Sequence, residues 1–164
     1  MDLIQHTSVW AKGDLFQGRI MLFVGILLLV SGIAILTSNH TLLKGTLIPI
    51  GLAVLILVGY GSFLAFSRSG HLETTRAAYL ENQEQAIQQE YKKALVDNKN
   101  YTMLKPIWIG LIIVSAILFI VVKTDYLKGL SLGLIGLFFI ALLVDALLHH
   151  RLKPYVDFLT ELNK

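Results

Sequence analysis

The sequence predicts an all-α integral membrane protein with four transmembrane helices, paired as two hairpins, and a long cytoplasmic helix between helices 2 and 3. Composition is the first observation behind this prediction. Of the 164 residues, 55% are hydrophobic and only 15% are charged, against about 25% charged residues in soluble domains. The second observation is that the apolar residues form four blocks with a single charged residue, Asp145, among them, and each block is close to the about 20 residues that a helix needs to cross a bilayer.

The chain begins with a mixed segment, residues 1–19, that we expect to lie at the cytoplasmic interface of the membrane. Aromatic and charged residues alternate in it, as Trp10, Phe16 and Arg19 illustrate. Such mixtures are typical of interfacial helices. The segment therefore leads into the first transmembrane hairpin, residues 20–66.

Each predicted hairpin consists of two apolar spans joined by a short polar turn. In the first hairpin the spans cover residues 20–38 and 45–66. In the second hairpin, residues 106–148, they cover residues 106–122 and 129–148. At about 1.5 Å per residue, each span is long enough to cross most or all of a hydrocarbon core of about 30 Å.

Prolines indicate where helices are expected to begin or end. Pro49 and Pro106 lie at the start of spans, where a helix tolerates proline because its first amides have no partners. Pro154 follows the last span and is expected to end its helix within a cytoplasmic tail, residues 149–164.

The distribution of Lys and Arg predicts the orientation. All but three of the 14 Lys and Arg residues lie in the two terminal segments and the central insert, and the exceptions are Lys44, Lys123 and Lys128 in the short turns. Short loops rich in Lys and Arg stay in the cytoplasm. Both termini and the insert are therefore expected to be cytoplasmic, in a multi-pass protein of the plasma membrane, with the bacterial inner membrane as the first choice.

The polar insert, residues 67–105, is predicted to contain one helix over residues 71–96. This stretch has few helix breakers before residues 97–100 and carries favourable pairs at i, i+3 spacing, such as Glu90 with Lys93. Its apolar stripe is too uneven for a coiled coil and is expected to lie against the protein's own tails or to dock a partner helix. The partner-binding candidates are Leu72, Tyr79, Leu80, Ile87, Tyr91 and Leu95.

Glycines at helical spacing predict where helices come close, because helix association in lipid depends on close backbone approach. These glycines are expected either to pack helices within one protomer or to form homo-oligomer contacts. The candidates are Gly18, Gly25, Gly32, Gly51, Gly59, Gly129, Gly133 and Gly136.

One group of titratable residues is a candidate for ion or proton chemistry. Asp145 and His149 are spaced i, i+4 near the end of the fourth span, with His150 beside them. Such a pair could share a proton or supply two metal ligands, with His71 or Glu73 as a third. The alternative is a structural Asp145 that reaches water or pairs with a neighbouring group near the interface.

The sequence carries no motif for catalysis or for a cofactor. The chain has no cysteine, which excludes disulfides and thiolate metal sites, and no phosphate-binding, dinucleotide or zinc-protease motif is present. We therefore expect no enzyme and no cofactor. The slightly acidic 71–96 segment also disfavours a nucleic-acid partner.

The function expected from these features is that of a small polytopic membrane scaffold, sensor or accessory subunit. Such a protein would self-associate or dock a cytoplasmic protein through the 71–96 helix, and a homo-oligomer in the bilayer is expected. An oligomeric channel or transporter for ions or a small solute is the first alternative. A membrane enzyme using Asp145 and His149 is the second.

Overall fold

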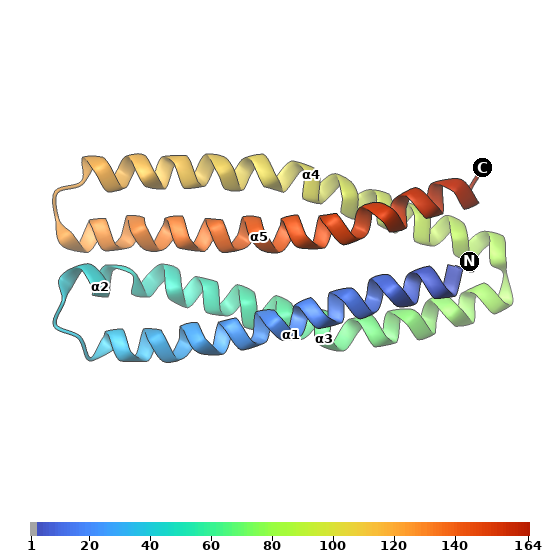
Figure 1. Cartoon of the computed structure of the whole chain (residues 1–164), viewed down its shortest axis with the longest axis horizontal. Coiled ribbons are helices and arrows are strands. Elements are labelled where there is room, and N and C mark those ends of the chain that lie inside the picture. Colours follow the sequence, from blue (N-terminus) through green and yellow to red (C-terminus); the bar gives the residue numbers. More distant parts are fainter. Residues whose placement is uncertain (1–2) are drawn as a thin grey trace.

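The computed structural model describes residues 3–164, apart from the side chain of Ser69, and the described chain is helical with no strand. Four of its helices are long and apolar enough to cross a membrane by length and composition. Figure 1 shows them running along one common axis. The helices are α1 (Leu3–Leu36), α2 (Thr41–Gly45), α3 (Leu47–Glu81), α4 (Gln83–Val121) and α5 (Asp125–Leu162).

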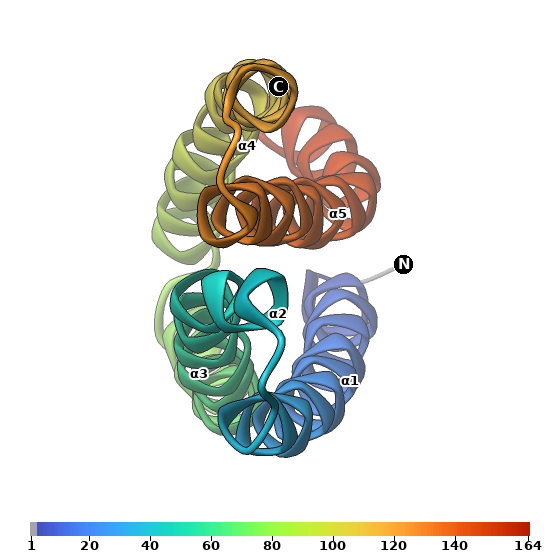
Figure 2. The same ribbon diagram turned by 90° about the vertical axis from the view of Figure 1, so that its left-hand side faces the viewer.

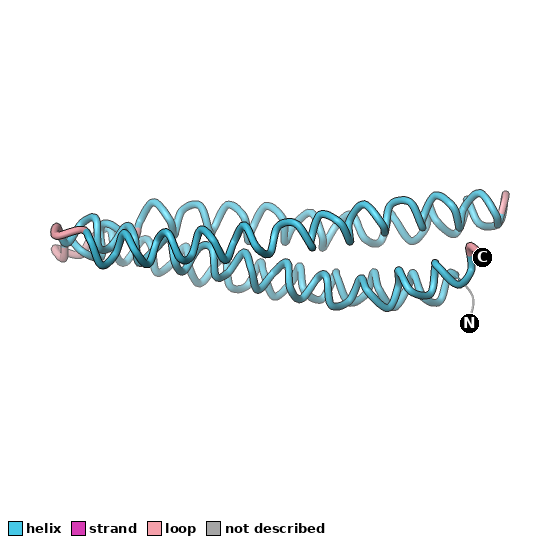
Figure 3. Tube along the Cα trace, turned by 90° about the horizontal axis from the view of Figure 1, so that it is seen from above, coloured by secondary structure: helices cyan, strands magenta, loops and turns pink. Residues whose placement is uncertain are grey.

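The four long helices lie in two pairs, α1 beside α3 and α4 beside α5, with the short α2 packed against α5. Both chain termini and the break between α3 and α4 are at one end of the molecule, which we call the polar end (Figure 3). The other two connections are at the opposite end, the apolar end. The end-on view in Figure 2 shows α1 next to α5 and α3 next to α4 across the two pairs.

The break at Asn82 corrects the prediction of one continuous helix over residues 71–96. Asn82 has an extended backbone, with φ −152° and ψ 103°, and its side chain accepts a hydrogen bond from the Gln85 amide at 3.1 Å. This is the geometry of an N-cap, which asparagine favours. The insert is therefore formed by the end of α3 and the beginning of α4, which fold back along each other.

Three predicted helix ends are also wrong, because the helices continue through them. Residues 97–100 and Pro106 lie inside α4, and Pro154 lies inside α5. A proline removes one backbone donor, yet α4 and α5 continue through these exposed positions. Residues 3–19 form the first part of α1, which continues into the first apolar span.

Large apolar side chains are exposed along the outside of the apolar end. Leu55 is 70% exposed and Ile120 is 79% exposed, which would be unfavourable in water but suits contact with lipid. The buried apolar core is instead concentrated at the polar end and around the middle of the bundle. The polar-end cluster consists of Leu3, Trp10, Ala94, Leu152, Tyr155, Val156 and Leu159, and the second cluster of Met21, Leu57, Leu64 and Leu148.

Glycines lie at the closest helix contacts. A Cβ atom on Gly18 of α1 would lie 2.8 Å from the Gly61 carbonyl oxygen of α3. A Cβ on Gly129 of α5 would collide with the Leu42 carbonyl of α2. Substitution with alanine at either position would force the two helices apart.

The predicted glycines fall into two groups. Gly25, Gly32 and Gly133, like Gly18 and Gly129, have atoms of another helix of the same chain within reach of a Cβ. By contrast, a Cβ at Gly51, Gly59 or Gly136 would meet no described atom within 4 Å. The sequence prediction missed Gly45 and Gly61, which face Tyr126 and Gly18 across their contacts.

A candidate binding site at the polar end

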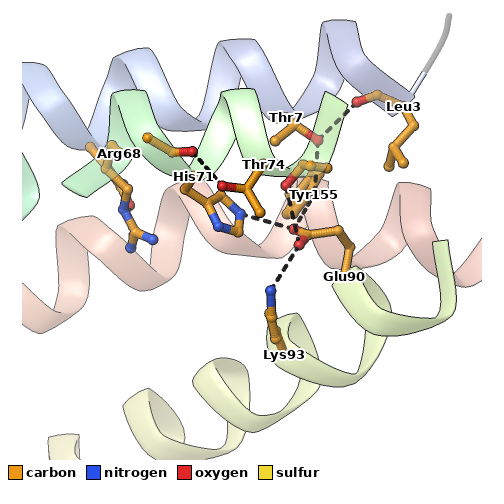
Figure 4. Close-up of polar contacts among 11 residues, drawn as sticks. Leu3, Thr7, Arg68, His71, Thr74, Glu90, Lys93 and Tyr155 are labelled. Atoms are coloured by element: carbon orange, nitrogen blue, oxygen red, sulfur yellow. Dashed lines mark hydrogen bonds and ion pairs between the residues drawn. The ribbon is translucent and has the colours of Figure 1, made fainter. Parts of the chain in front are cut away.

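A buried carboxylate, Glu90 of α4, is the centre of the polar end (Figure 4). The residue is only 4% exposed. Its Oε2 accepts hydrogen bonds from His71 Nε2 at 3.0 Å and from the Tyr155 hydroxyl at 3.1 Å. Its Oε1 accepts from the Thr75 hydroxyl at 3.3 Å and from the Lys93 ammonium at 3.4 Å. Glu90 thus links α4 directly to α3 and α5.

Tyr155 extends this network to α1. Its hydroxyl oxygen lies 2.9 Å from the hydroxyl oxygen of Thr7, which also donates to the Leu3 carbonyl. The indole of Trp10 stacks on the Tyr155 ring, with centroids 5.1 Å apart and planes within 5°, and meets His71 edge-on. All four long helices therefore contribute to one polar cluster around the buried Glu90. We call it the Glu90 cluster, and it is defined by Thr7, His71, Thr75, Glu90, Lys93 and Tyr155.

The contacts of Glu90 determine its ionisation. Burial alone would raise its pKa, but the hydrogen bond and charge of His71, with Lys93 and Tyr155, outweigh it and hold the pKa of Glu90 below its usual value. Burial and the adjacent Glu90 charge raise the pKa of Tyr155, so the phenol remains a donor. The cluster is therefore an ionised carboxylate surrounded by donors.

A cavity of about 480 Å³ opens beside the Glu90 cluster. All four long helices line it, with Trp10 from α1, Arg68 from α3, Asp97 from α4 and Leu152 from α5 among the contributors. Its size falls in the range of about 300–1,000 Å³ found for small-molecule sites. A ligand there would touch every long helix of the bundle.

A second buried carboxylate, Asp14, lies on α1 seven residues beyond Thr7 in the direction of the apolar end. It is 1% exposed, and its Oδ2 forms an ion pair of 2.9 Å with Arg68 of α3. The guanidinium of Arg68 also lies 4.3 Å from the centre of the Trp10 ring, a cation–π contact. Burial raises the pKa of Asp14, and the opposing charges of Arg68 and Arg151 only partly offset this.

Among the candidates for ion or proton chemistry, Asp145 and His149 have hydrogen-bond partners other than one another. Asp145 accepts a hydrogen bond from the Trp108 indole at 2.6 Å. His149 contacts Lys105 Nζ through Nδ1 at 2.6 Å and donates from Nε2 to the Asn98 side-chain oxygen at 2.8 Å. An ammonium group can only donate, so His149 is held neutral as the Nε2–H tautomer.

The other candidates lie elsewhere. His71 belongs to the Glu90 cluster, while Glu73 and His150 are exposed. Within the described residues, no three His, Asp or Glu side chains are placed to hold a metal ion.

The predicted partner-binding stripe of the insert is divided between the inside and the outside of the bundle. Tyr79, Ile87 and Tyr91 pack against the polar-end core, whereas Leu80 is 78% exposed and Leu95 is 40% exposed. Leu72 is half-buried. Much of the stripe therefore covers the protein's own terminal helices, one of the two outcomes that the sequence left open.

Sequence analysis missed the buried role of Glu90 because Glu90 and Lys93 look like an ordinary surface pair. A signal was present in the flanking residues, since Ala86 and Ala94 lie four positions before and after Glu90, and both are buried. Small residues at i−4 and i+4 place Glu90 on a face where another helix can approach closely. Asp14 had no comparable signal.

Fold and site together define the class as a multi-helix protein with spans suited to a membrane and a polar-cored end. Comparison with protein families, with curated proteins and with solved structures gives no match. The physical features of the chain are therefore the basis for the function proposed below.

Proposed function

We propose that this protein is a small polytopic membrane scaffold, sensor or accessory subunit. In this proposal the four apolar spans cross the membrane as two hairpins, and the polar end projects into the cytoplasm as a four-helix module. The Glu90 cluster is the observation that carries it, because it joins all four long helices beside a cavity. A ligand or partner that binds this module would contact helices that continue into every span.

The arrangement of charge supports the orientation. Lys12, Arg19 and Lys153 are exposed near the polar end, where the rule that positive charges stay inside puts the cytoplasm. The absence of cysteine from the sequence makes this directly testable, since any cysteine that is introduced is the only thiol. Asn82→Cys should react with a membrane-impermeant maleimide only after the cells are opened, and Lys123→Cys should react in intact cells. The reverse pattern would invert the proposed topology.

The exposed Leu80 is the proposed contact for a partner or a second copy. A photo-crosslinking amino acid in place of Leu80 should give a discrete adduct in living cells, and the same residue in place of Leu55, in a span, serves as the control. An adduct with a different protein from position 80 supports the accessory role, and an adduct with a second copy supports self-association. If position 80 gives no adduct beyond that of the control, the scaffold proposal is wrong.

A further inference from the structure

A groove of about 370 Å³ lies between α1 and α5, and Trp10 and Tyr155 line both it and the cavity beside the Glu90 cluster. From α1 it is lined by His6, Val9 and Gly13, among others. The absence of a side chain at Gly13 lets the Arg151 side chain lie across α1, since a Cβ there would be 3.2 Å from Arg151 Cδ. Arg151 also donates to the Gly13 carbonyl. The Arg151 side chain, which lines the groove, is therefore held in place by its hydrogen bond to α1.

The polar groups of this groove have the character of an anion site. Arg151 and the imidazoles of His150 and His6 supply nitrogen donors, and Val9 and Pro154 supply apolar walls. None of the lining residues, all of which the structure describes, is acidic. The cavity near Glu90 differs in this respect, because two carboxylates line it.

The α5 side of the groove lies at the depth of lipid headgroups. Arg151 lies three residues beyond the last apolar span, or about 4.5 Å along the helix. Gly13 lies seven residues before the first apolar span, or about 10.5 Å, so the α1 side of the groove extends beyond the headgroups. The headgroup layer extends about 5–8 Å beyond the hydrocarbon on each side. The exposed Phe16 and Lys12 on α1 are further features of an interfacial surface.

We infer that the α1–α5 groove binds the phosphate of an anionic phospholipid, with Arg151 and His150 as the phosphate contacts. The inference rests on the membrane placement proposed above. Charge complementarity selects this occupant over a zwitterionic lipid, whose own cation would meet Arg151.

The test uses full-length protein carrying Trp108→Phe in a neutral detergent. The chain has two tryptophans, so this change leaves only Trp10, which lines the groove, as a fluorescent reporter. Phosphatidylglycerol should give a saturable change in Trp10 emission. Arg151→Gln should weaken binding about fivefold, the effect of one cation near an anionic headgroup, and His150→Gln should weaken it less.

Two controls separate this site from general charge attraction. Lys99→Gln removes the same charge from an exposed position of α4 and should leave the affinity unchanged. Phosphatidylcholine should bind at least tenfold more weakly than phosphatidylglycerol, and so should glycerol phosphate without acyl chains. Equal effects of Lys99→Gln and Arg151→Gln, or equal binding of phosphatidylcholine, would overturn the inference.

Other outcomes have equally definite meanings. Equal affinity for glycerol phosphate would overturn the lipid assignment in favour of a soluble phosphate compound. If Arg151→Gln fails to fold, as judged by circular dichroism, the test depends on His150→Gln, at an exposed position. An unchanged affinity of His150→Gln for phosphatidylglycerol would then overturn the inference. Because the titration is made in detergent, a negative result leaves the labelling test of topology untouched, and the two proposals can fail separately.

Discussion

Glu90 and Asp14 are both buried carboxylates at the polar end, yet their surroundings shift their pKa values in opposite directions. Glu90 has four side-chain donors, and its pKa is lowered. Asp14 has one ion-pair partner, its Oδ1 is buried without a hydrogen bond among the described groups, and its pKa is raised. Burial costs both of them hydration, so the number of donors decides which charge the fold stabilises.

The comparison predicts that loss of the Glu90 charge has the largest effect. Glu90→Gln removes the charge and replaces one of the two acceptor oxygens with an amide donor, so either His71 and Tyr155 or Thr75 and Lys93 lose their acceptor. It should lower the free energy of unfolding by about 3 kcal/mol, as for other buried pairs that lose one partner. Thermal and denaturant unfolding in detergent, followed by circular dichroism, would measure it. Glu84→Gln, on an exposed part of the same helix, should change stability by less than about 0.5 kcal/mol. Equal effects of the two variants would show that Glu90 is not stabilised by its cluster.

Asp14→Asn should have a smaller effect, about 1 kcal/mol or less at neutral pH, because the raised pKa of Asp14 means that the fold favours its neutral form. Asparagine keeps the size of the side chain, and Arg68 retains its contact with Trp10, so only one charged contact is lost. The same unfolding measurements apply, with Asp157→Asn on exposed α5 as the control. A larger loss from Asp14→Asn than from Glu90→Gln would reverse the proposed order of the two carboxylates.

The pH dependence of stability should differ in sign between the two sites. Glu90 has a lowered pKa in the folded state, so its contribution is present above its unfolded value and is lost as the pH falls through the folded value. Asp14 has a raised pKa, so its contribution is present below its unfolded value of about 3.8 and is lost as the pH rises through the folded value.

Stability measured between pH 3 and pH 7 would separate these contributions. Glu90→Gln should flatten the loss of stability at the acid end of the range. Asp14→Asn should instead remove a decline of stability that begins just above pH 3.8, with a slope of at most about 1.4 kcal/mol per pH unit for one proton. Parallel curves for wild type and Asp14→Asn would mean that Asp14 ionises normally despite its burial.

The sequence predicted the four apolar helices well because length and hydrophobicity are local properties. It failed at Asn82, although Asn82 and Gln85 have the spacing of a capping signal, because the helix formers on both sides outweighed it. It failed at Pro106 and Pro154, which the structure places at exposed positions inside α4 and α5. Helical periodicity indicates where apolar side chains recur and contains neither the cap nor the continuation through proline.

The site was less predictable than the fold because its contacts join residues that are distant in the sequence. Asp14 stands in a stretch that resembles an interfacial helix, and its burial depends on Arg68, which follows it by more than fifty residues. His149 was predicted as a partner of Asp145 four residues away, but its contacts are Asn98 and Lys105 of another helix. Spacing within one helix indicates which side chains share a face and leaves open what that face meets.

The smallest effect is expected from Lys93→Ala. Lys93 lies 3.4 Å from Glu90, but its side chain is 61% exposed, and ion pairs that are open to solvent contribute about 0–1 kcal/mol. The donors His71 and Tyr155 should therefore stabilise the Glu90 charge in the absence of Lys93. The free energy of unfolding of Lys93→Ala should be within about 0.5 kcal/mol of that of the wild type. Tyr155→Phe, which removes a buried donor, should cost more. If Lys93→Ala costs as much as Tyr155→Phe, then net charge stabilises Glu90, and the contrast with Asp14 reflects the number of nearby cations instead of the number of buried hydrogen bonds.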